Sequence, residues 1–506
     1  MNAVRIALDN LDHYGEYTKV HFDGVSYTNA DMVGFARSLA TVLRDHGVKA
    51  GDHVAVMMPN RPEVEGAFQA SWMLGAVITP VTPQLGVGEV SYMLADAGIT
   101  AILTSPKLAE RVVEASAHAP SVRQIFTFGE SDVPGATNVL RLVLQAPQQQ
   151  EIVARDGDDL ALLLYTSGTT GHPKGVMLSH ANLITGTEAI VQRNPGIARQ
   201  TLLHPLPLSH VYGVLIMNLC NRWGWTQVLM PHFDTKKAFE LIERYKANRI
   251  TVTPTMLVYM INFPERTKYD TSSLTMISSG GAALLESVRT EFEQLFHCKV
   301  MQGYGLSESG SVATGYEGSE TYRPGSVGRA LPGIELAILD GKGNALPPGD
   351  AGEIALRGAN VMKGYWKKDE ATAASIVNGW LLTGDVGHLD AEGYVYITDR
   401  KKDLIIKGGE NISPKEIEEA LQSHFAVAEV AVLGYPDPTY GENVAAAVVL
   451  RSGMSASDDD LRAHCAQFVT KFKLPATFVY VEALPKSPNG KILKREIKIG
   501  AGADTR

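Results

Sequence analysis

The sequence of 506 residues is poor in cysteine, in positive charge and in long apolar runs. Its three cysteines, Cys220, Cys298 and Cys465, are odd in number and far apart, which excludes a disulfide framework and a four-ligand zinc site. We expect inert thiols in a reducing cytosol. The 46 basic residues are outnumbered by 55 acidic ones, so the net charge is −9 and no basic patch for nucleic acid is found.

Signals for membrane insertion and secretion are missing as well. The longest apolar stretches, such as 160–165, fall far short of the ~18 residues that a membrane helix needs. The first residues contain no apolar segment of the kind found in signal peptides. We therefore predict a cytoplasmic protein without integral membrane contact, in which any anionic ligand is bound by a local cluster of donors.

The composition, with 45% hydrophobic and 20% charged residues, is that of a folded globular protein with a substantial core. From about residue 50, apolar runs alternate with helix-like segments, a pattern typical of a large and mostly parallel α/β assembly. Strands are predicted at 54–58, 76–81, 101–104, 227–230, 250–253 and 299–301. Helices are predicted between them, at 63–74, 89–97, 235–246 and 284–296.

The later part of the chain has a different texture. Between 324 and 400, short apolar runs are separated by glycine, proline and aspartate, which predicts β-hairpins or a small barrel. After 400, helices at 414–424 and 457–469 and strands at 429–433, 444–450 and 478–481 predict a smaller α+β domain. The charged stretch 399–403 lies at the junction, where a flexible connection is expected.

The stretch 165–175 (Tyr-Thr-Ser-Gly-Thr-Thr-Gly-His-Pro-Lys-Gly) directly follows an apolar run and is the most informative segment of the sequence. Its glycines permit close turns, its four hydroxyls are donors and Lys174 adds a positive charge, so the loop can wrap a polyphosphate. It is not a Walker A loop, because no Ser or Thr follows the lysine.

This loop resembles the phosphate loop of the adenylate-forming superfamily, which includes acyl-CoA synthetases, firefly luciferase and peptide-synthetase adenylation domains. Further motifs of that superfamily follow in the same order: 206–210 (Leu-Pro-Leu-Ser-His), 302–308 (Gln-Gly-Tyr-Gly-Leu-Ser-Glu), 383–385 (Thr-Gly-Asp), 399–400 (Asp-Arg) and 488–491 (Pro-Asn-Gly-Lys). The resemblance covers nearly the whole chain, and is nearest to bacterial fatty-acyl or aryl acid:CoA ligases. It implies an N-terminal AMP-binding domain at 1–399, made of α/β sheets plus a small β-barrel-like part, a hinge at 400–402 around Lys402, and a mobile α+β C-terminal domain at 403–506.

The resemblance also implies an enzyme with two half-reactions. A carboxylate attacks the α-phosphate of ATP, giving an acyl-adenylate and pyrophosphate, and a thiol then takes the acyl group and releases AMP. Glu308 and Thr169 would hold Mg²⁺, a cation that prefers oxygen ligands, Tyr304 would stack on adenine and Asp385 would accept the ribose hydroxyls. The implied ATP- and AMP-binding residues are Thr166, Ser167, Gly168, Thr169, Thr170, Lys174, Gly281, Ala282, Gln302, Gly303, Tyr304, Gly305, Leu306, Ser307, Asp385, Arg400 and Lys491.

The catalytic residues implied by the resemblance are Lys491, Glu308 and His210. Lys491, in an exposed turn of the C-terminal domain, would bridge the carboxylate and the α-phosphate, since lysine is a compact, movable point charge. After rotation about Lys402, Gly408 and Gly409 would make room for the pantetheine arm of coenzyme A (CoA).

The acyl pocket of relatives lies behind the histidine of the 206–210 motif. An arginine that pairs a second carboxylate in dicarboxylate-activating relatives is replaced here by Gln302 and Gly303, which disfavours a malonate-type acid. The sequence leaves a fatty acid, which we favour, and a benzoate- or cinnamate-type acid both open. The predicted pocket residues are His210, Val211, Tyr212, Gly213, Val214, Gly280 and Gly303.

Four functions compete at this stage. A stand-alone acid:CoA ligase is favoured, because no carrier domain follows Lys491 in the sequence given. A ligase that loads a separate carrier protein, a luciferase-like oxygenase and a nucleotide-binding scaffold share the nucleotide motifs. The partners expected are a small carboxylic acid, ATP and CoA, and the sequence leaves a homodimer open.

Overall fold

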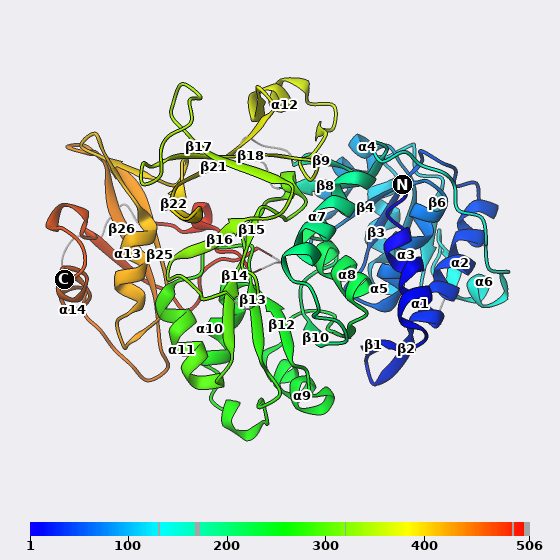
Figure 1. The fold of residues 1–506 in the computed structure, drawn as a ribbon, viewed down its shortest axis with the longest axis horizontal. Helices are drawn as coiled ribbons and strands as arrows, with labels where there is room; N and C mark the ends of the chain where they lie inside the picture. The colour runs from blue at the N-terminus through cyan, green and yellow to red at the C-terminus, as the bar shows by residue number, and fades with distance from the viewer. Residues whose placement is uncertain (130–131, 167–172, 319, 488–489, 500–506) are drawn as a thin grey trace.

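The computed structural model describes residues 1–129, 132–166, 173–318, 320–487 and 490–499. Their strands form four sheets, three up to Arg400 and a fourth after it (Figure 1). No helix within these ranges is long and apolar enough to cross a membrane. The three cysteines are buried and unpaired, as predicted.

The first large sheet has eight strands, and all neighbours from β8 to β7 pair in parallel. Its order is β19 (Gly364–Tyr365), β9 (Lys174–Ser179), β8 (Leu160–Thr166), β4 (Val77–Pro80), β3 (His53–Met57), β5 (Ile99–Thr104), β6 (Gln124–Thr127) and β7 (Thr137–Asn138). The helices of this region are α2 (Asn29–Asp45), α3 (Pro62–Met73), α4 (Val87–Ala97), α5 (Pro106–Ser116), α6 (Val139–Gln145) and α7 (His180–Arg193).

The second large sheet has seven strands and is parallel from β14 to β1. Its order is β14 (Lys299–Gln302), β13 (Met276–Ser279), β12 (Arg249–Val252), β10 (Thr201–His204), β11 (Thr226–Leu229), β1 (Thr18–Phe22) and β2 (Val25–Thr28). The helices of this region are α1 (Arg5–Tyr14), α8 (Val211–Trp223), α9 (Thr235–Tyr245), α10 (Pro254–Ile261) and α11 (Glu286–Phe296).

Local sequence signals explain where these elements begin. β3 is buried along its whole length, and its sequence is a nearly continuous run of apolar residues, as is typical of parallel strands that are covered on both faces. Pro62, Pro106 and Pro254 open helices at a position where no N–H is needed. Ser179 and Asn182 form a capping box at the start of α7, immediately after the strand that follows the predicted phosphate loop.

The third sheet is antiparallel and is the small β part predicted from the texture of 324–400. Its order is β15 (Thr314–Gly315), β16 (Ser326–Ala330), β22 (Tyr394–Arg400), β21 (Trp380–Leu389), β18 (Gly352–Gly358) and β17 (Ile334–Leu339), with β20 (Ile376–Val377) paired to β21 and α12 (Asp369–Ser375) before it.

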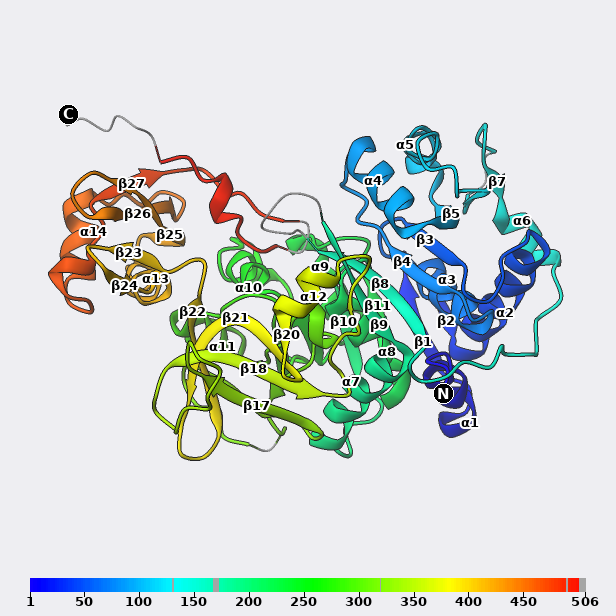
Figure 2. The same ribbon diagram turned by 90° about the horizontal axis from the view of Figure 1, so that it is seen from above.

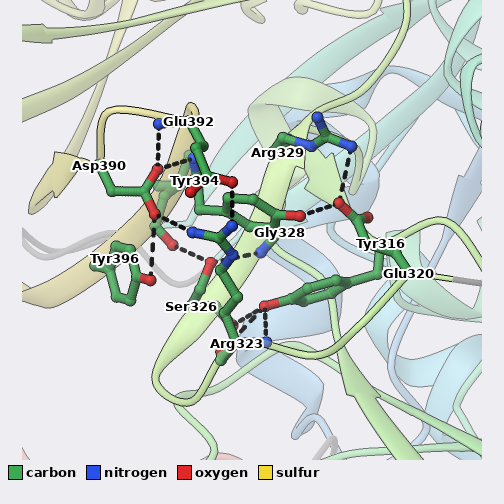
Figure 3. A network of polar contacts seen from close by, with 11 residues as sticks. Tyr316, Glu320, Arg323, Ser326, Gly328, Arg329, Asp390, Glu392, Tyr394 and Tyr396 are labelled. Atoms are coloured by element: carbon green, nitrogen blue, oxygen red, sulfur yellow. Dashed lines mark hydrogen bonds and ion pairs between the residues drawn. The ribbon is translucent and has the colours of Figure 1, made fainter. Parts of the chain in front are cut away.

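A polar network fixes one end of this third sheet (Figure 3). Arg323 pairs with Asp390 at 3.0 Å and with Glu392, and its guanidinium lies over the Tyr394 ring. The Tyr316 hydroxyl donates to the Arg323 or Ser326 carbonyl oxygens, at 3.1 and 3.3 Å. Tyr316 and Arg323, which lie between β15 and β16, are therefore tied to β16, β22 and the turn before β22.

The C-terminal part contains the fourth sheet, as predicted. Its order is β24 (Glu410–Ile412), β23 (Ile405–Lys407), β26 (Gly441–Leu450) and β25 (Val427–Asp437), with β27 (Thr477–Tyr480) parallel to β26 and with α13 (Pro414–Gln422) and α14 (Asp458–Cys465). The hairpin β25–β26 runs further than the predicted 429–433, because Asp437 accepts hydrogen bonds from the turn N–H groups of Thr439 and Tyr440.

The C-terminal part is docked on the N-terminal part in this structure. The Glu419 carboxylate on α13 accepts from the N–H of Glu286 at the start of α11, and Arg451 forms a two-bond ion pair with Glu291 at 2.9 Å. Figure 2 shows the segment after β27, in red, leaving the fourth sheet and returning toward α10. This arrangement brings the turn that contains Lys491 back to the N-terminal part.

Candidate active site

The two ends of the predicted phosphate loop lie at the edge of the first sheet. Thr166 closes β8 and faces Lys174, the first residue of β9, in the antiparallel pairing. The Lys174 ammonium lies 5.0 Å from the centre of the Tyr365 ring. Ser167, Gly168, Thr169 and Thr170 lie outside the described residues, so their predicted contacts with phosphate and Mg²⁺ stay predictions.

Glu308 lies beside this loop, in a short 3₁₀ turn (Ser307–Ser309) after β14. The Tyr365 hydroxyl donates to Glu308 Oε1 at 2.8 Å, and the backbone oxygen of Glu308 accepts from the N–H of Met362 at 2.8 Å. Burial and the charge of Glu308 raise the pKa of Tyr365, so this tyrosine remains a donor. Lys174, Tyr365 and Glu308 therefore form one polar cluster.

The donor set fits Mg²⁺ bound together with phosphates. Among the described residues no group of three or more His, Cys, Asp or Glu side chains could hold a metal ion alone. Mg²⁺ in phosphate sites needs only one or two carboxylates, since phosphate and water oxygens complete its shell. Glu308 Oε1 is held by Tyr365, and the carboxylate keeps further acceptor positions for a cation.

Asp385 joins two other predicted residues, Tyr304 and Arg400. It is only 3% exposed, accepts from the Tyr304 hydroxyl at 2.6 Å and pairs with Arg400 Nε at 2.8 Å. The backbone turns at Gly384, whose φ of 72° is a left-handed conformation that suits glycine. Burial and the charge of Asp385 raise the pKa of Tyr304, so the phenol stays protonated. A carboxylate has about four acceptor positions, so Asp385 can still accept ribose hydroxyls.

The glycine-rich turns after β13 and β14 lie next to this cluster. A Cβ on Gly305 would come within 2.2 Å of the Ser311 backbone, and Gly281 has a φ of 81°. Both positions require glycine, and the close approach of backbone that they permit suits a planar base. One cavity is lined by residues of both turns: Gly280, Gly281, Gln302, Gly303, Tyr304 and Gly305. The Gln302 amide donates to the Ala282 oxygen at 3.5 Å. Leu306 and Ser307 begin the turn that carries Glu308.

The turn that contains Lys491 is docked on α10. The Thr255 hydroxyl donates to the Gly490 oxygen at 2.7 Å, and Lys486 Nζ donates to the Tyr259 hydroxyl at 2.8 Å while pairing with Glu429 at 2.6 Å. Among the described residues no carboxylate pairs with the Lys491 ammonium. Lys486 and Gly490 are therefore both held by α10, and Lys491 is left available to a ligand.

Several charged residues act on the Lys491 ammonium. Burial, and then the positive charges of Arg400 and Lys402, lower the pKa of Lys491 to about 8, while Asp385 and Asp403 act in the opposite direction. Burial and the charge of Lys491 lower the pKa of the His210 imidazole to about 4. Lys491 is thus largely protonated at neutral pH, and His210 is neutral.

A cavity of about 160 Å³ lies between α8 and the second sheet. Tyr212, Gly280 and Gly303, three of the residues predicted for the acyl pocket, line this cavity, and a Cβ on Gly280 would come within 3.1 Å of the Tyr212 ring. The α8 residues that line it share one helical face, at the spacing i, i+3, i+4, i+7 and i+11: Tyr212, Leu215, Ile216, Leu219 and Trp223.

The other predicted pocket residues occupy different places. Val211 and Val214 lie on the opposite face of α8, in the core with Leu208, and His210 caps α8 by accepting from the N–H of Tyr212. Gly213 is required for packing, because a Cβ there would come within 2.1 Å of the Pro207 oxygen. These residues position α8 and are not among those that line the cavity.

The predicted hinge and CoA residues lie away from the cavity in this structure. Lys402 is exposed in the turn between β22 and β23, where Asp403 N–H donates to the Arg400 oxygen at 2.9 Å. Gly408 and Gly409 form the β23–β24 turn, and the side chains nearest to Gly408 are Phe472 and Tyr440 of the C-terminal part. The hinge and CoA roles therefore remain predictions.

Sequence reasoning missed Tyr365 and the docking pair Thr255 and Lys486. Tyr365 lies 57 residues after Glu308, and no spacing rule connects the two. Thr255 follows the proline that opens α10, and Lys486 is five residues before Lys491. The proximity of Lys486 to the motif at 488–491 was the one available signal.

Comparisons with known proteins agree with this geometry. The AMP-binding enzyme family matches residues 9–366, and the AMP-binding enzyme C-terminal domain matches 416–491. The chain is 34% identical to a long-chain-fatty-acid–CoA ligase of Bacillus subtilis over 97% of this chain and 93% of that protein, and 34% identical to 4-coumarate–CoA ligase 5 of Oryza sativa over 95% and 90%.

A solved structure agrees as well, that of the anthranilate CoA ligase AuaEII in complex with anthranoyl-AMP. It superposes with a TM-score of 0.93 at 25% identity, covering 97% of this chain and 95% of that one. These matches extend over both the N-terminal and the C-terminal part, and so over every residue cluster described above. The chain therefore belongs to the AMP-binding enzyme family and is an AMP-forming ligase.

Proposed function

We propose that this enzyme is an ATP-dependent carboxylic acid:CoA ligase that acts in the cytoplasm. The observation that carries the proposal is the position of Lys491, whose turn is docked on α10, within electrostatic range of Asp385, Arg400 and His210, and without a carboxylate partner of its own among the described residues. ATP and Mg²⁺ are the cofactors of the family and CoA is the co-substrate.

The first half-reaction follows from charge placement. The substrate carboxylate attacks the α-phosphate of ATP, and negative charge grows on the oxygens between them. Lys491, protonated at neutral pH and partly desolvated, stabilises that charge, and Lys174 neutralises the outgoing phosphates. Mg²⁺, when bound, supplies further neutralisation of the triphosphate. Asp385 and Tyr304 hold the nucleoside part, so that the α-phosphate lies in line with the acid.

The second half-reaction requires a different face of the C-terminal part. We propose that the domains divide at 1–399, 400–402 and 403–506, and that rotation about Lys402 moves Lys491 away and brings Gly408 and Gly409 to the acyl-adenylate. The support is that Lys402 is exposed and lies in a three-residue turn between two sheets. His210, neutral at physiological pH, then lies at the entrance used by the thiol.

We propose an aliphatic acid as substrate. The cavity runs along the second sheet from Gly280 back to Met276, four residues of strand or ~13 Å at ~3.3 Å per residue. A benzoyl ring would occupy only the part next to Gly280. An aromatic acid of the cinnamate kind remains the alternative, since relatives of both kinds are 34% identical to this chain.

AMP and pyrophosphate release from ATP tests the proposal. The purified enzyme is given Mg²⁺ and aliphatic, benzoic or cinnamic acids, each with and without CoA. We expect AMP release that requires CoA with aliphatic acids. Pyrophosphate release that CoA does not accelerate would instead favour loading of a carrier protein. The homodimer stays a prediction, which light scattering on the same sample tests.

A further inference from the structure

Arg249 lies at the far end of the acyl cavity and has no role in the functions described so far. It opens β12, whose carboxyl end leads to Thr253 next to Gly281. Because all neighbours of β12 run parallel to it, Arg249 is at the edge of the sheet opposite to the nucleotide. The residue lines the same continuous cavity as Gly280 and Gly303.

The strand register directs Arg249 toward the cavity. Arg249 is paired with Met276 and Thr251 with Ser278, and all four residues line the cavity. Side chains two residues apart on a strand point to the same face, so Thr251 and Ser278 lie between Arg249 and the glycine turn. From Arg249 to Thr253 the chain advances four residues, ~13 Å.

The guanidinium of Arg249 lacks a partner of opposite charge among the described residues. One N–H lies 2.9 Å from the Met276 sulfur, a weak acceptor, and the guanidinium carbon is 5.2 Å from the Trp225 ring centre. The Nε atom is buried and has no hydrogen-bond partner in the described part of the chain. Burial alone lowers the pKa of Arg249, since no neighbouring charge contributes.

Three other arginines of this protein that are at least partly shielded from solvent pair with carboxylates. Arg289 pairs with Glu286 and Glu293, Arg451 with Glu291, and Arg222 with Glu188 at 2.6 Å. An arginine in an apolar cavity without an anion is unfavourable, because its charge and its forked donors lose water without replacement. A carboxylate matches this fork with two parallel hydrogen bonds.

We propose that the acid activated by this enzyme carries a second carboxylate at its far end, and that Arg249 binds this group. This inference rests on the proposed acid:CoA ligase activity and specifies its substrate class as aliphatic α,ω-dicarboxylic acids. The distance along β12 selects a medium-length spacer. A malonate-type acid stays disfavoured, because its second carboxylate would lie beside Gln302 and Gly303, and the described residues that line the cavity include no cation other than Arg249 at its far end.

The test compares acids that differ only at the far end. Wild-type enzyme is assayed for CoA-dependent AMP release with octanedioic, decanedioic and dodecanedioic acids and with the matching monocarboxylic acids. The same assays are run on Arg249→Met and on the control Lys299→Met. Lys299 is an exposed cation that pairs in register with Met276 but does not line the cavity.

We expect wild type to prefer one diacid over its monocarboxylic match, and Arg249→Met to lower kcat/KM for that diacid by roughly 10- to 100-fold. The lower kcat/KM should come from a higher KM with kcat unchanged, because Arg249 would bind the far carboxylate equally well in the ground state and in the transition state. Activity on the monocarboxylic acid should be unchanged or higher, and Lys299→Met should retain the wild-type preference. A general loss of folding would instead lower kcat/KM for the diacid and for the monocarboxylic acid together.

Two results would overturn the inference. If monocarboxylic acids give CoA-dependent AMP release and no diacid is preferred, the ligase function stands and the role of Arg249 is wrong. If the wild-type preference for a diacid is unchanged in Arg249→Met, another group binds the far carboxylate. Absence of CoA-dependent AMP release with every acid would contradict the proposed function itself, and this inference with it.

Discussion

The nucleotide side and the acid side of this site are built in different ways. On the nucleotide side, Asp385, Tyr304 and Arg400 are joined by short polar contacts, and Glu308 by another to Tyr365. On the acid side, one face of α8, alternate residues of β12 and β13 and the end of β14 form the cavity wall, which carries one arginine among its described residues. We therefore propose that polar geometry fixes the shared chemistry, whereas packing and the charge of Arg249 fix the choice of acid.

The largest expected effect concerns the nucleotide side. Lys491→Ala should lower the rate of adenylate formation by about 10²- to 10³-fold, as loss of one preorganised charge-stabilising donor does. Conversion of a supplied acyl-adenylate to the thioester should be retained, because Lys491 is expected to leave the site in that step. Rapid-quench assays of each half-reaction measure this.

The exposed Lys498 provides a matched control. Lys498→Ala removes the same charge from the same segment and should leave both half-reactions unchanged. Equal loss of both half-reactions in Lys491→Ala would contradict the catalytic assignment.

A second prediction separates the two half-reactions in the opposite direction. Lys402→Pro should retain adenylate formation, because the Lys402 N–H donates no backbone hydrogen bond in the described structure and proline removes none. Thioester formation should fall at least ~10-fold, since proline fixes φ at the proposed hinge. Normal overall turnover in this variant would remove the hinge role.

The pH dependence sharpens the role of Lys491. Its pKa is lowered to about 8, so the active ammonium is present below that pH and is lost as pH rises through it. We predict that kcat/KM for adenylation falls by up to ~10-fold per pH unit above pH ~8. His210, with a pKa of about 4, should contribute no change between pH 5 and pH 7. A flat profile between pH 8 and pH 10 would show that a neutral lysine suffices.

Removing the charge of Asp385 should have a moderate effect. In Asp385→Asn the Arg400 guanidinium loses its ion partner, and the Tyr304 hydroxyl loses a charged acceptor. We expect KM for ATP to rise about 10-fold, equivalent to ~1.4 kcal/mol, with little change in KM for the acid. Glu353 offers a control: Glu353→Gln disturbs the neighbouring contact to Gly384 without touching the carboxylate of Asp385. Similar changes in both variants would mean that the turn, and not the charge, matters.

The smallest expected effect is on the acid side. Gly280→Ala places a methyl group 3.1 Å from the Tyr212 ring, which must shift by a few tenths of an ångström. We expect KM for the acid to rise a few-fold while KM for ATP is unchanged. Steady-state assays with each substrate varied measure the two constants. An effect on ATP alone would place this glycine in the nucleotide site.

The sequence predicts the residues of the nucleotide side better than those of the acid side, for physical reasons. Asp385, Arg400 and Lys491 lie in motifs with fixed spacing, so each was identified before any contact between them was known. On the acid side, α8 is buried nearly all round, so its periodicity did not reveal that Val214 faces the core and Leu215 the cavity. β12 is likewise buried on both faces, and only its register with β13 shows where Arg249 points.

The fold itself was largely predictable, because the alternation of apolar runs and helix signals is set locally. What local signals cannot give is the docking of the C-terminal part. It depends on Thr255, Lys486 and Glu419, residues whose partners lie 235, 227 and 133 positions away. Contacts of this range arise from tertiary packing alone.

The most direct test of the account is a search for the acyl-adenylate in a single turnover. Enzyme in excess over ATP is mixed with Mg²⁺ and a preferred aliphatic acid without CoA, quenched, and analysed by mass spectrometry. The account predicts acyl-adenylate and pyrophosphate, followed by complete conversion to acyl-CoA and AMP when CoA is added. Formation of ADP and phosphate, or an acyl-adenylate that CoA does not consume, would contradict it.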